Sequence, residues 1–145
     1  MRKVLCLFIV PVLMAVAGCG GGGGGGGSST PFFGGVYNVS LIKVSDTCGL
    51  NTDNIVSFTH TVNQDGRRVL LDSGSVVLQG RVTDDNKGFD VTNREESGGC
   101  VTSTAVVYRP TEQSGADYGV GLALLAVCGA DRCELSYGGT AKRRP

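Results

Sequence analysis

The sequence predicts an all-β fold, most simply a small antiparallel up-and-down β-barrel of about eight strands. Residues 55–64 alternate between apolar and polar side chains, which is typical of a strand that is buried on one face. Turn signals such as Asp65-Gly66 separate similar segments at intervals of about 8–12 residues, the spacing of an all-β sandwich or barrel. We find no stretch of the folded part that combines a helical period with helix caps.

The first four strands follow from this alternation and from the tight turns between them. Residues 36–44 place Tyr37, Val39 and Leu41 on one face of the first strand. The hairpin signal Asp65-Gly66 separates the second strand from the third, and a turn at residues 72–74 precedes the fourth. The predicted strands are therefore residues 36–44, 55–64, 68–71 and 76–83.

The last four strands are bounded by glycine-rich or polar loops. Asn86-Lys87-Gly88 turns the chain into the fifth strand, and Ser97-Gly98-Gly99 leads into the sixth. The seventh strand follows a polar loop at residues 110–117 and ends in an apolar run that fits a buried strand. The predicted strands are residues 89–93, 101–109, 119–127 and 134–137.

The order of these strands bears on how the sheet closes. Consecutive strands joined by short turns favour a barrel, because a closed sheet has no exposed edge. A β-sandwich with Greek-key connections is the alternative. It needs long crossovers between strands, and only residues 110–117 form a candidate for one.

The first nineteen residues have the pattern of an export signal. Arg2 and Lys3 precede an apolar run at residues 4–16, whose 13 residues are too few to span a bilayer as a helix. The run ends in Val16-Ala17-Gly18-Cys19, which resembles the lipobox of bacterial lipoproteins. The resemblance implies that a diacylglyceryl group is attached to the Cys19 sulfur, that the chain is cleaved before Cys19, and that the freed amine is acylated with a fatty acid such as palmitate.

Together with the strand pattern, this resemblance divides the chain into three predicted parts and predicts where the protein is located. Residues 1–18 are the signal peptide, residues 19–31 are the lipidated cysteine with a glycine-rich tether, and residues 32–145 are a disulfide-bonded β domain. The tether has a root-mean-square reach of ~20 Å. Gly20 stands where an Asp commonly signals retention in the inner membrane, so the expected location is the outer membrane, facing the periplasm.

Four cysteines follow the lipidation site, namely Cys48, Cys100, Cys128 and Cys133. An even number of cysteines in an exported chain predicts disulfides, and four cysteines allow three pairings. We prefer Cys128–Cys133 with Cys48–Cys100, because Cys128 and Cys133 enclose a four-residue loop and would face each other across a hairpin.

Several kinds of function are not expected. Without Arg2 and Lys3 the chain has 11 basic and 13 acidic side chains, and no basic patch that would bind nucleic acid. No C-x-x-C pair is present and the single histidine has no ligand partner at zinc spacing, so we predict no metal and no cofactor. His60 lies on the apolar face of its strand without a Gly-x-Ser-x-Gly elbow, so we interpret it as structural and expect no enzyme.

The start and the end of the β domain also resemble a known family. Gly35-Val36-Tyr37 is similar to the Gly-x-Trp that opens lipocalin-type barrels, and Arg143 or Arg144 matches the Arg that packs across that aromatic ring. Small lipid-anchored barrels of the calycin kind, which include envelope protease inhibitors, are the most similar in size. The resemblance implies a binding function, through the barrel mouth or an N-terminal strand.

The expected function is therefore a non-catalytic one in the bacterial envelope. We predict an interaction or structural protein that is held to the membrane by the lipid on Cys19, with an envelope protein as its partner. The alternative is a barrel that binds a small apolar ligand or acts like a protease inhibitor. The small number of aromatic residues and the absence of Trp favour a filled interior over a hollow one.

Overall fold

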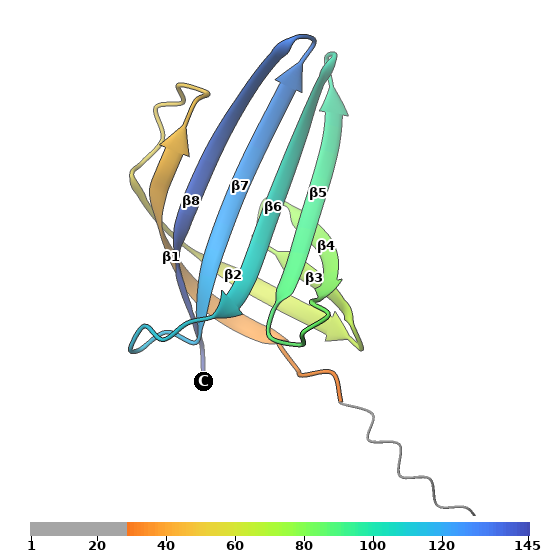
Figure 1. Ribbon diagram of the computed structural model, residues 1–145, viewed down its shortest axis with the longest axis vertical. Helices are drawn as coiled ribbons and strands as arrows, with labels where there is room; N and C mark the ends of the chain where they lie inside the picture. The colour runs from red at the N-terminus through yellow and green to blue at the C-terminus, as the bar shows by residue number, and fades with distance from the viewer. Residues whose placement is uncertain (1–28) are drawn as a thin grey trace, which may run out of the picture.

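Eight antiparallel strands close into one barrel, in which each strand pairs with its neighbours along the chain and β8 pairs with β1 (Figure 1). The computed structural model describes residues 29–145, so the predicted signal peptide and Cys19 lie outside the described residues. The prediction of a small all-β up-and-down barrel is confirmed. The strands are β1 (Gly35–Asp46), β2 (Ile55–Asp65), β3 (Arg68–Asp72), β4 (Val77–Val82), β5 (Phe89–Ser97), β6 (Cys100–Pro110), β7 (Tyr118–Cys128) and β8 (Asp131–Arg143).

The strand that differs most from its prediction is β8, which has 13 residues instead of the four at 134–137. The Gly-Gly-Thr sequence that follows Tyr137 resembles the end of a strand, but these residues pair with β7 on one side and β1 on the other. A Cβ atom built on Gly139 would lie 2.1 Å from the carbonyl oxygen of Ser40 in β1. Glycine therefore lets the two backbones approach closely here and does not end the strand.

The walls of the barrel differ in height. β3 and β4 have five and six residues, whereas β5–β8 have between 9 and 13. In Figure 1 the strands β5–β8 accordingly rise far above the β3–β4 hairpin. The interior is therefore less enclosed at the upper end, on the side of β3 and β4.

The lower half of the interior is filled by aromatic side chains. Tyr108 is fully buried, with its ring stacked on that of Phe89 at a centroid distance of 4.5 Å and packed edge-on against that of Tyr37 at 5.6 Å. Phe33 lies before the first strand and packs against the rings of Phe89 and Tyr118 at 5.7 and 5.8 Å. Such pairs stabilise a core beyond the area that they bury.

Phe33 closes the lower end of the barrel, which the sequence did not predict. Its side chain is only 4% exposed. Its backbone N–H donates to Gln64 Oε1 at 2.6 Å, and its carbonyl oxygen accepts a hydrogen bond from the Tyr37 hydroxyl at 2.6 Å. The short segment before β1 is thus fixed to the barrel by both polar and apolar contacts.

The predicted pairing of the cysteines is wrong, because the structure joins Cys48 to Cys133 and Cys100 to Cys128. Cys128 pairs with Asp131 across a turn of two residues rather than four, so Cys133 does not lie opposite Cys128. Cys128 instead lies directly opposite Cys100 in the neighbouring strand β6. The two Cα atoms are 4.7 Å apart in the Cys48–Cys133 disulfide and 4.2 Å apart in the Cys100–Cys128 disulfide.

The two arginines named in the resemblance to lipocalins both hold the end of β8 in place. Arg143 donates a hydrogen bond to the carbonyl oxygen of Gly34, and its guanidinium lies 5.8 Å from the ring centre of Phe32. Arg144 donates to Asn38 Oδ1 at 2.7 Å and to Thr59 Oγ1 at 3.0 Å. Arg143 therefore lies at the lower end of the barrel, next to the segment that carries Phe33.

Candidate functional site

The upper half of the barrel holds a cavity of about 340 Å³, which we call the cup. Inward-facing side chains of β2, β4, β6 and β7 form its wall, and the turn between β3 and β4 contributes to its rim. This volume is near the lower end of the range of about 300–1,000 Å³ that is usual for small-molecule sites. The lining residues are Phe58, His60, Ser73, Ser75, Val76, Leu78, Thr104, Val106, Leu122 and Leu124.

The cup is apolar because the inward alternation of the strands continues above the aromatic core. Val106 and Leu78 are buried in its wall, whereas Phe58, Leu122 and Leu124 are only partly buried. These three side chains would be covered if the opposite wall were as tall as β5–β8, but β3 and β4 end too early. The cup is therefore a consequence of unequal strand length, which leaves part of an apolar interior without a partner.

His60 is the polar side chain that lies deepest in the cup. It is 2% exposed, and its Nδ1 atom lies 2.7 Å from the hydroxyl oxygen of Tyr108, which belongs to the aromatic core below. Burial lowers the pKa of His60 to about 4, so the imidazole is neutral at pH 7. Burial also raises the pKa of Tyr108, so this hydroxyl keeps its proton. The pair is thus a neutral hydrogen bond and not an ion pair.

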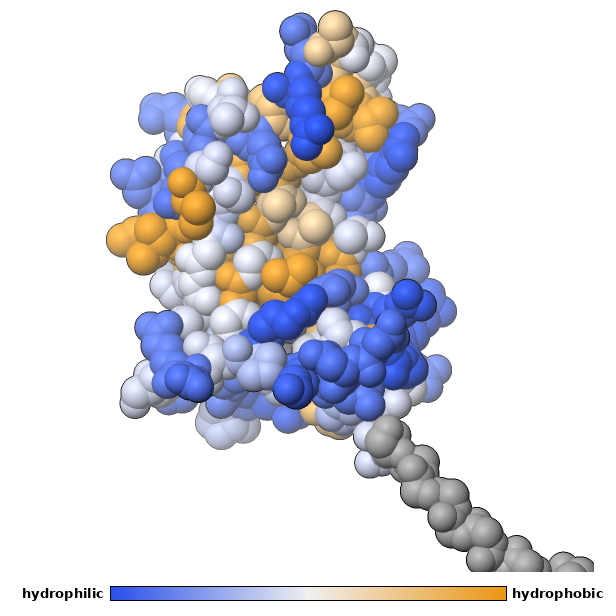
Figure 2. Space-filling view, viewed as in Figure 1, coloured by the Kyte–Doolittle hydropathy of each residue, from blue (hydrophilic) through white to orange (hydrophobic). Residues whose placement is uncertain are grey.

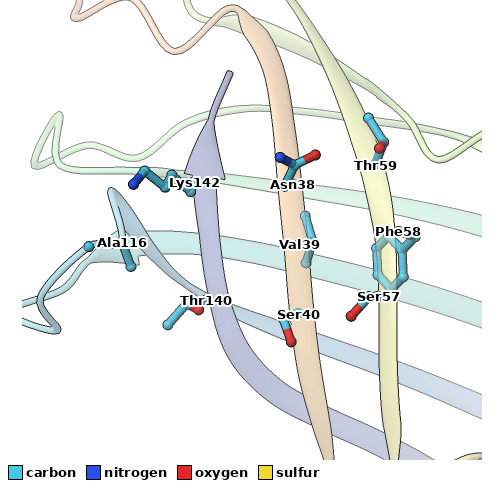
Figure 3. A pocket seen from close by; sticks show the side chains of 10 residues that line it. Asn38, Val39, Ser40, Ser57, Phe58, Thr59, Ala116, Thr140 and Lys142 are labelled. Carbon is cyan, nitrogen blue, oxygen red and sulfur yellow. The ribbon is translucent and has the colours of Figure 1, made fainter. Parts of the chain in front are cut away.

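A second hollow lies on the outer surface, across β1, β2 and β8 (Figure 3). Its volume is about 450 Å³, and the side chains of Ser40, Thr59, Thr140 and Lys142 line it from the outward faces of the strands. Such hydroxyl groups are common on the solvent face of a sheet. This hollow lies on the outside of the sheet, whereas the cup is lined mainly by apolar side chains of the barrel interior, so the cup is the better candidate for a small-molecule site.

The outer face also has an exposed aliphatic corner, formed by Ile42, Val44, Leu50 and Ile55. Each is between 51% and 72% exposed, and Ile42 pairs with Ile55 across β1 and β2. Figure 2 shows that apolar residues also cross the middle of the face formed by β6 and β7, above a mainly hydrophilic lower end. An exposed apolar surface of this kind is typical of a contact with another molecule.

The residues singled out in the sequence lie in different places. His60 lines the cup, while the four cysteines lie near the upper ends of β6–β8 and in the β1–β2 loop. No group of three or more His, Cys, Asp or Glu within residues 29–145 could hold a metal ion. The same residues include no helix that is long and apolar enough to cross a membrane.

Comparison with protein-family models, with curated proteins and with solved structures finds no match to this chain.

Proposed function

We propose that this protein is a lipid-anchored bacterial envelope protein whose barrel binds a small, mainly apolar molecule in the cup. The observation that carries the proposal is the apolar cavity of about 340 Å³ above a core that is otherwise filled. Of the two functions expected from the sequence, this geometry favours the ligand-binding barrel.

The size of the cup limits the ligand. At about 30 Å³ for each non-hydrogen atom, as in liquid water, the cup holds roughly eleven such atoms. Burying them against Leu122, Leu124 and Phe58 removes apolar surface from water on both sides, at ~25 cal/mol per Å². A compact molecule with one ring or a short chain fits this volume, and a long acyl chain would extend out of the opening.

Filling the cup tests this function. We expect Leu122→Trp to abolish binding of the neutral fluorescent dye 1-aminonaphthalene, which is small enough for the cup, because the indole would occupy the cavity that Leu122 lines. Leu125→Trp is the matched control, since Leu125 lies on the same strand but belongs to its outward face. Equal dye binding by wild type and both variants, with unchanged far-ultraviolet circular dichroism, would show that the cup is not the binding site.

The anchor is a separate part of the proposal. Two disulfides are in keeping with an oxidising compartment outside the cytoplasm. Two or more acyl chains on Cys19 would attach the protein stably to a membrane, because each buried CH₂ contributes ~0.8 kcal/mol. In bacteria that express the protein, Cys19→Ser should eliminate labelling with radioactive palmitate and release the domain from the membrane fraction. Membrane attachment of the unlabelled variant would refute the lipid anchor.

The exposed aliphatic corner favours a second candidate function, which is contact with an apolar surface of another envelope protein. A photo-crosslinking amino acid at Val44, which is 72% exposed, would then give one discrete crosslinked species in intact cells. The control position is Arg81, which is also exposed and lies on β4. Identical crosslinking patterns at the two positions would eliminate this candidate.

A further inference from the structure

The hydrogen bond between His60 and Tyr108 connects the cup to the buried core. The two residues are 48 positions apart in the sequence, and the barrel brings His60 Nδ1 to 2.7 Å from the Tyr108 hydroxyl oxygen. Tyr108 is fully buried. A buried hydroxyl group that lacks a hydrogen-bond partner costs about 1–3 kcal/mol, so the position of each proton in this pair matters.

The surroundings of Tyr108 determine the direction of this hydrogen bond. Within residues 29–145, His60 Nδ1 is the only hydrogen-bond partner of the Tyr108 hydroxyl. If Nδ1 carried a proton and donated it, the phenolic hydrogen would have no acceptor. The hydroxyl therefore donates to Nδ1, and the neutral imidazole carries its proton on Nε2.

The Nε2–H group is available to a molecule in the cup. Nε2 makes no hydrogen bond to any described residue, yet it is not one of the fully buried side-chain atoms that lack a partner in this part of the chain. Nε2 therefore still contacts open space, and the open space that His60 lines is the cup. A single N–H donor thus lies deep in a cavity whose other polar groups are the hydroxyls of Ser73, Ser75 and Thr104.

We propose that the cup selects an apolar ligand with an uncharged carbonyl oxygen, which accepts a hydrogen bond from Nε2–H of His60. The inference rests on the proposed function and adds the chemistry of the ligand. No lining residue is charged, so an ionised carboxylate would be buried without a counter-charge. Protonation of His60 would supply one, but burial opposes it by lowering the pKa of this residue to about 4. A ketone, an aldehyde or an ester satisfies the donor without adding charge.

Nuclear magnetic resonance can test the proton position directly, because His60 is the only histidine of the chain. We expect a long-range ¹H–¹⁵N spectrum at pH 7 to show a protonated Nε2 and an unprotonated Nδ1. The Tyr108→Phe variant removes the hydroxyl that fixes this tautomer, and a mixture of the two tautomers should replace the single one. A wild-type spectrum with the proton on Nδ1 would overturn the inference.

Ligand selectivity gives the second test, in competition with 1-aminonaphthalene at pH 7.5. Ethylbenzene and acetophenone have nearly the same shape, but only acetophenone has a carbonyl oxygen. The double variant His60→Phe/Tyr108→Phe removes the donor without leaving a buried hydroxyl unpaired. We expect the ratio of the ethylbenzene Kd to the acetophenone Kd to be about tenfold larger in wild type than in the double variant, or ~1.4 kcal/mol. Hydration of the free ligands cancels in this comparison.

The outcomes separate the two proposals. Equal ratios in wild type and double variant, or benzoate binding more tightly than acetophenone in wild type, would overturn the selectivity for a carbonyl while leaving the cup as a binding site. If wild type binds neither the dye nor any of these molecules, the proposed function itself is wrong.

Discussion

His60 should make the stability of this protein depend on pH in a way that can be worked out from its burial. In the unfolded chain a histidine has a pKa near 6.5, and in the folded barrel burial lowers the pKa of His60 to about 4. Between these values the unfolded state binds one more proton than the folded state. The contribution of His60 is therefore fully present above pH 6.5 and is lost as the pH falls toward 4.

The size of this effect follows from the shift in pKa. One unit corresponds to 1.36 kcal/mol, so acidification from pH 7 to pH 4 should lower the free energy of unfolding by about 3 kcal/mol through this residue. No charged side chain lines the cup with His60, and its hydrogen-bond partner Tyr108 stays neutral in this range. The effect should therefore arise from burial of the imidazole rather than from a nearby charge.

Urea unfolding at a series of pH values between 4 and 7.5 measures how the free energy of unfolding changes with pH. The double variant His60→Phe/Tyr108→Phe is the reference, because it lacks the titrating group and leaves no buried hydroxyl unpaired. Carboxylates titrate in both proteins, so subtraction of the two pH profiles isolates His60. If the profiles run parallel, His60 is not buried as described, and the reasoning about the neutral imidazole in the cup fails with it.

Three further predictions concern the rest of the barrel. The double variant Cys48→Ser/Cys133→Ser opens a loop of 85 residues, and its free energy of unfolding in urea should be about 4–5 kcal/mol lower than that of wild type. Peptide mapping of wild type without reductant should recover the Cys48–Cys133 pair, and recovery of Cys48–Cys100 instead would contradict the structure. Gly139→Ala should lower Tm by several degrees, because its Cβ would lie 2.1 Å from the carbonyl oxygen of Ser40. Gly138→Ala is the control and should change Tm little, because its Cβ would make only an ordinary contact with Val44. Similar Tm values for the two variants would contradict the close approach of β8 to β1. Phe33→Ala should lower the free energy of unfolding, measured in urea, by about 3–5 kcal/mol. A decrease of less than about 1 kcal/mol would show that Phe33 does not close the barrel.

The alternation of side chains made the strands and the inward-facing residues predictable. Tyr37, Val39 and Leu41 were placed on one face from their spacing alone, and all three are buried. Strand ends were less predictable where pairing overrides local signals, as at the glycines of β8, which are held in place by strands on both sides. Phe33 was missed because it precedes the alternating segment, and no periodic pattern marks a residue that folds over the end of a barrel.

The sequence by itself determined that this chain forms about eight strands, which face of the first two strands is apolar, and that four cysteines should be paired. These properties depend on neighbouring residues and on side-chain type, which can be read along the chain. Only the tertiary structure decided which cysteines meet, that His60 reaches Tyr108, and that the interior is left open at one end. All three depend on strand register and on differences in strand length, which act between segments that are far apart in sequence and are fixed when the barrel closes.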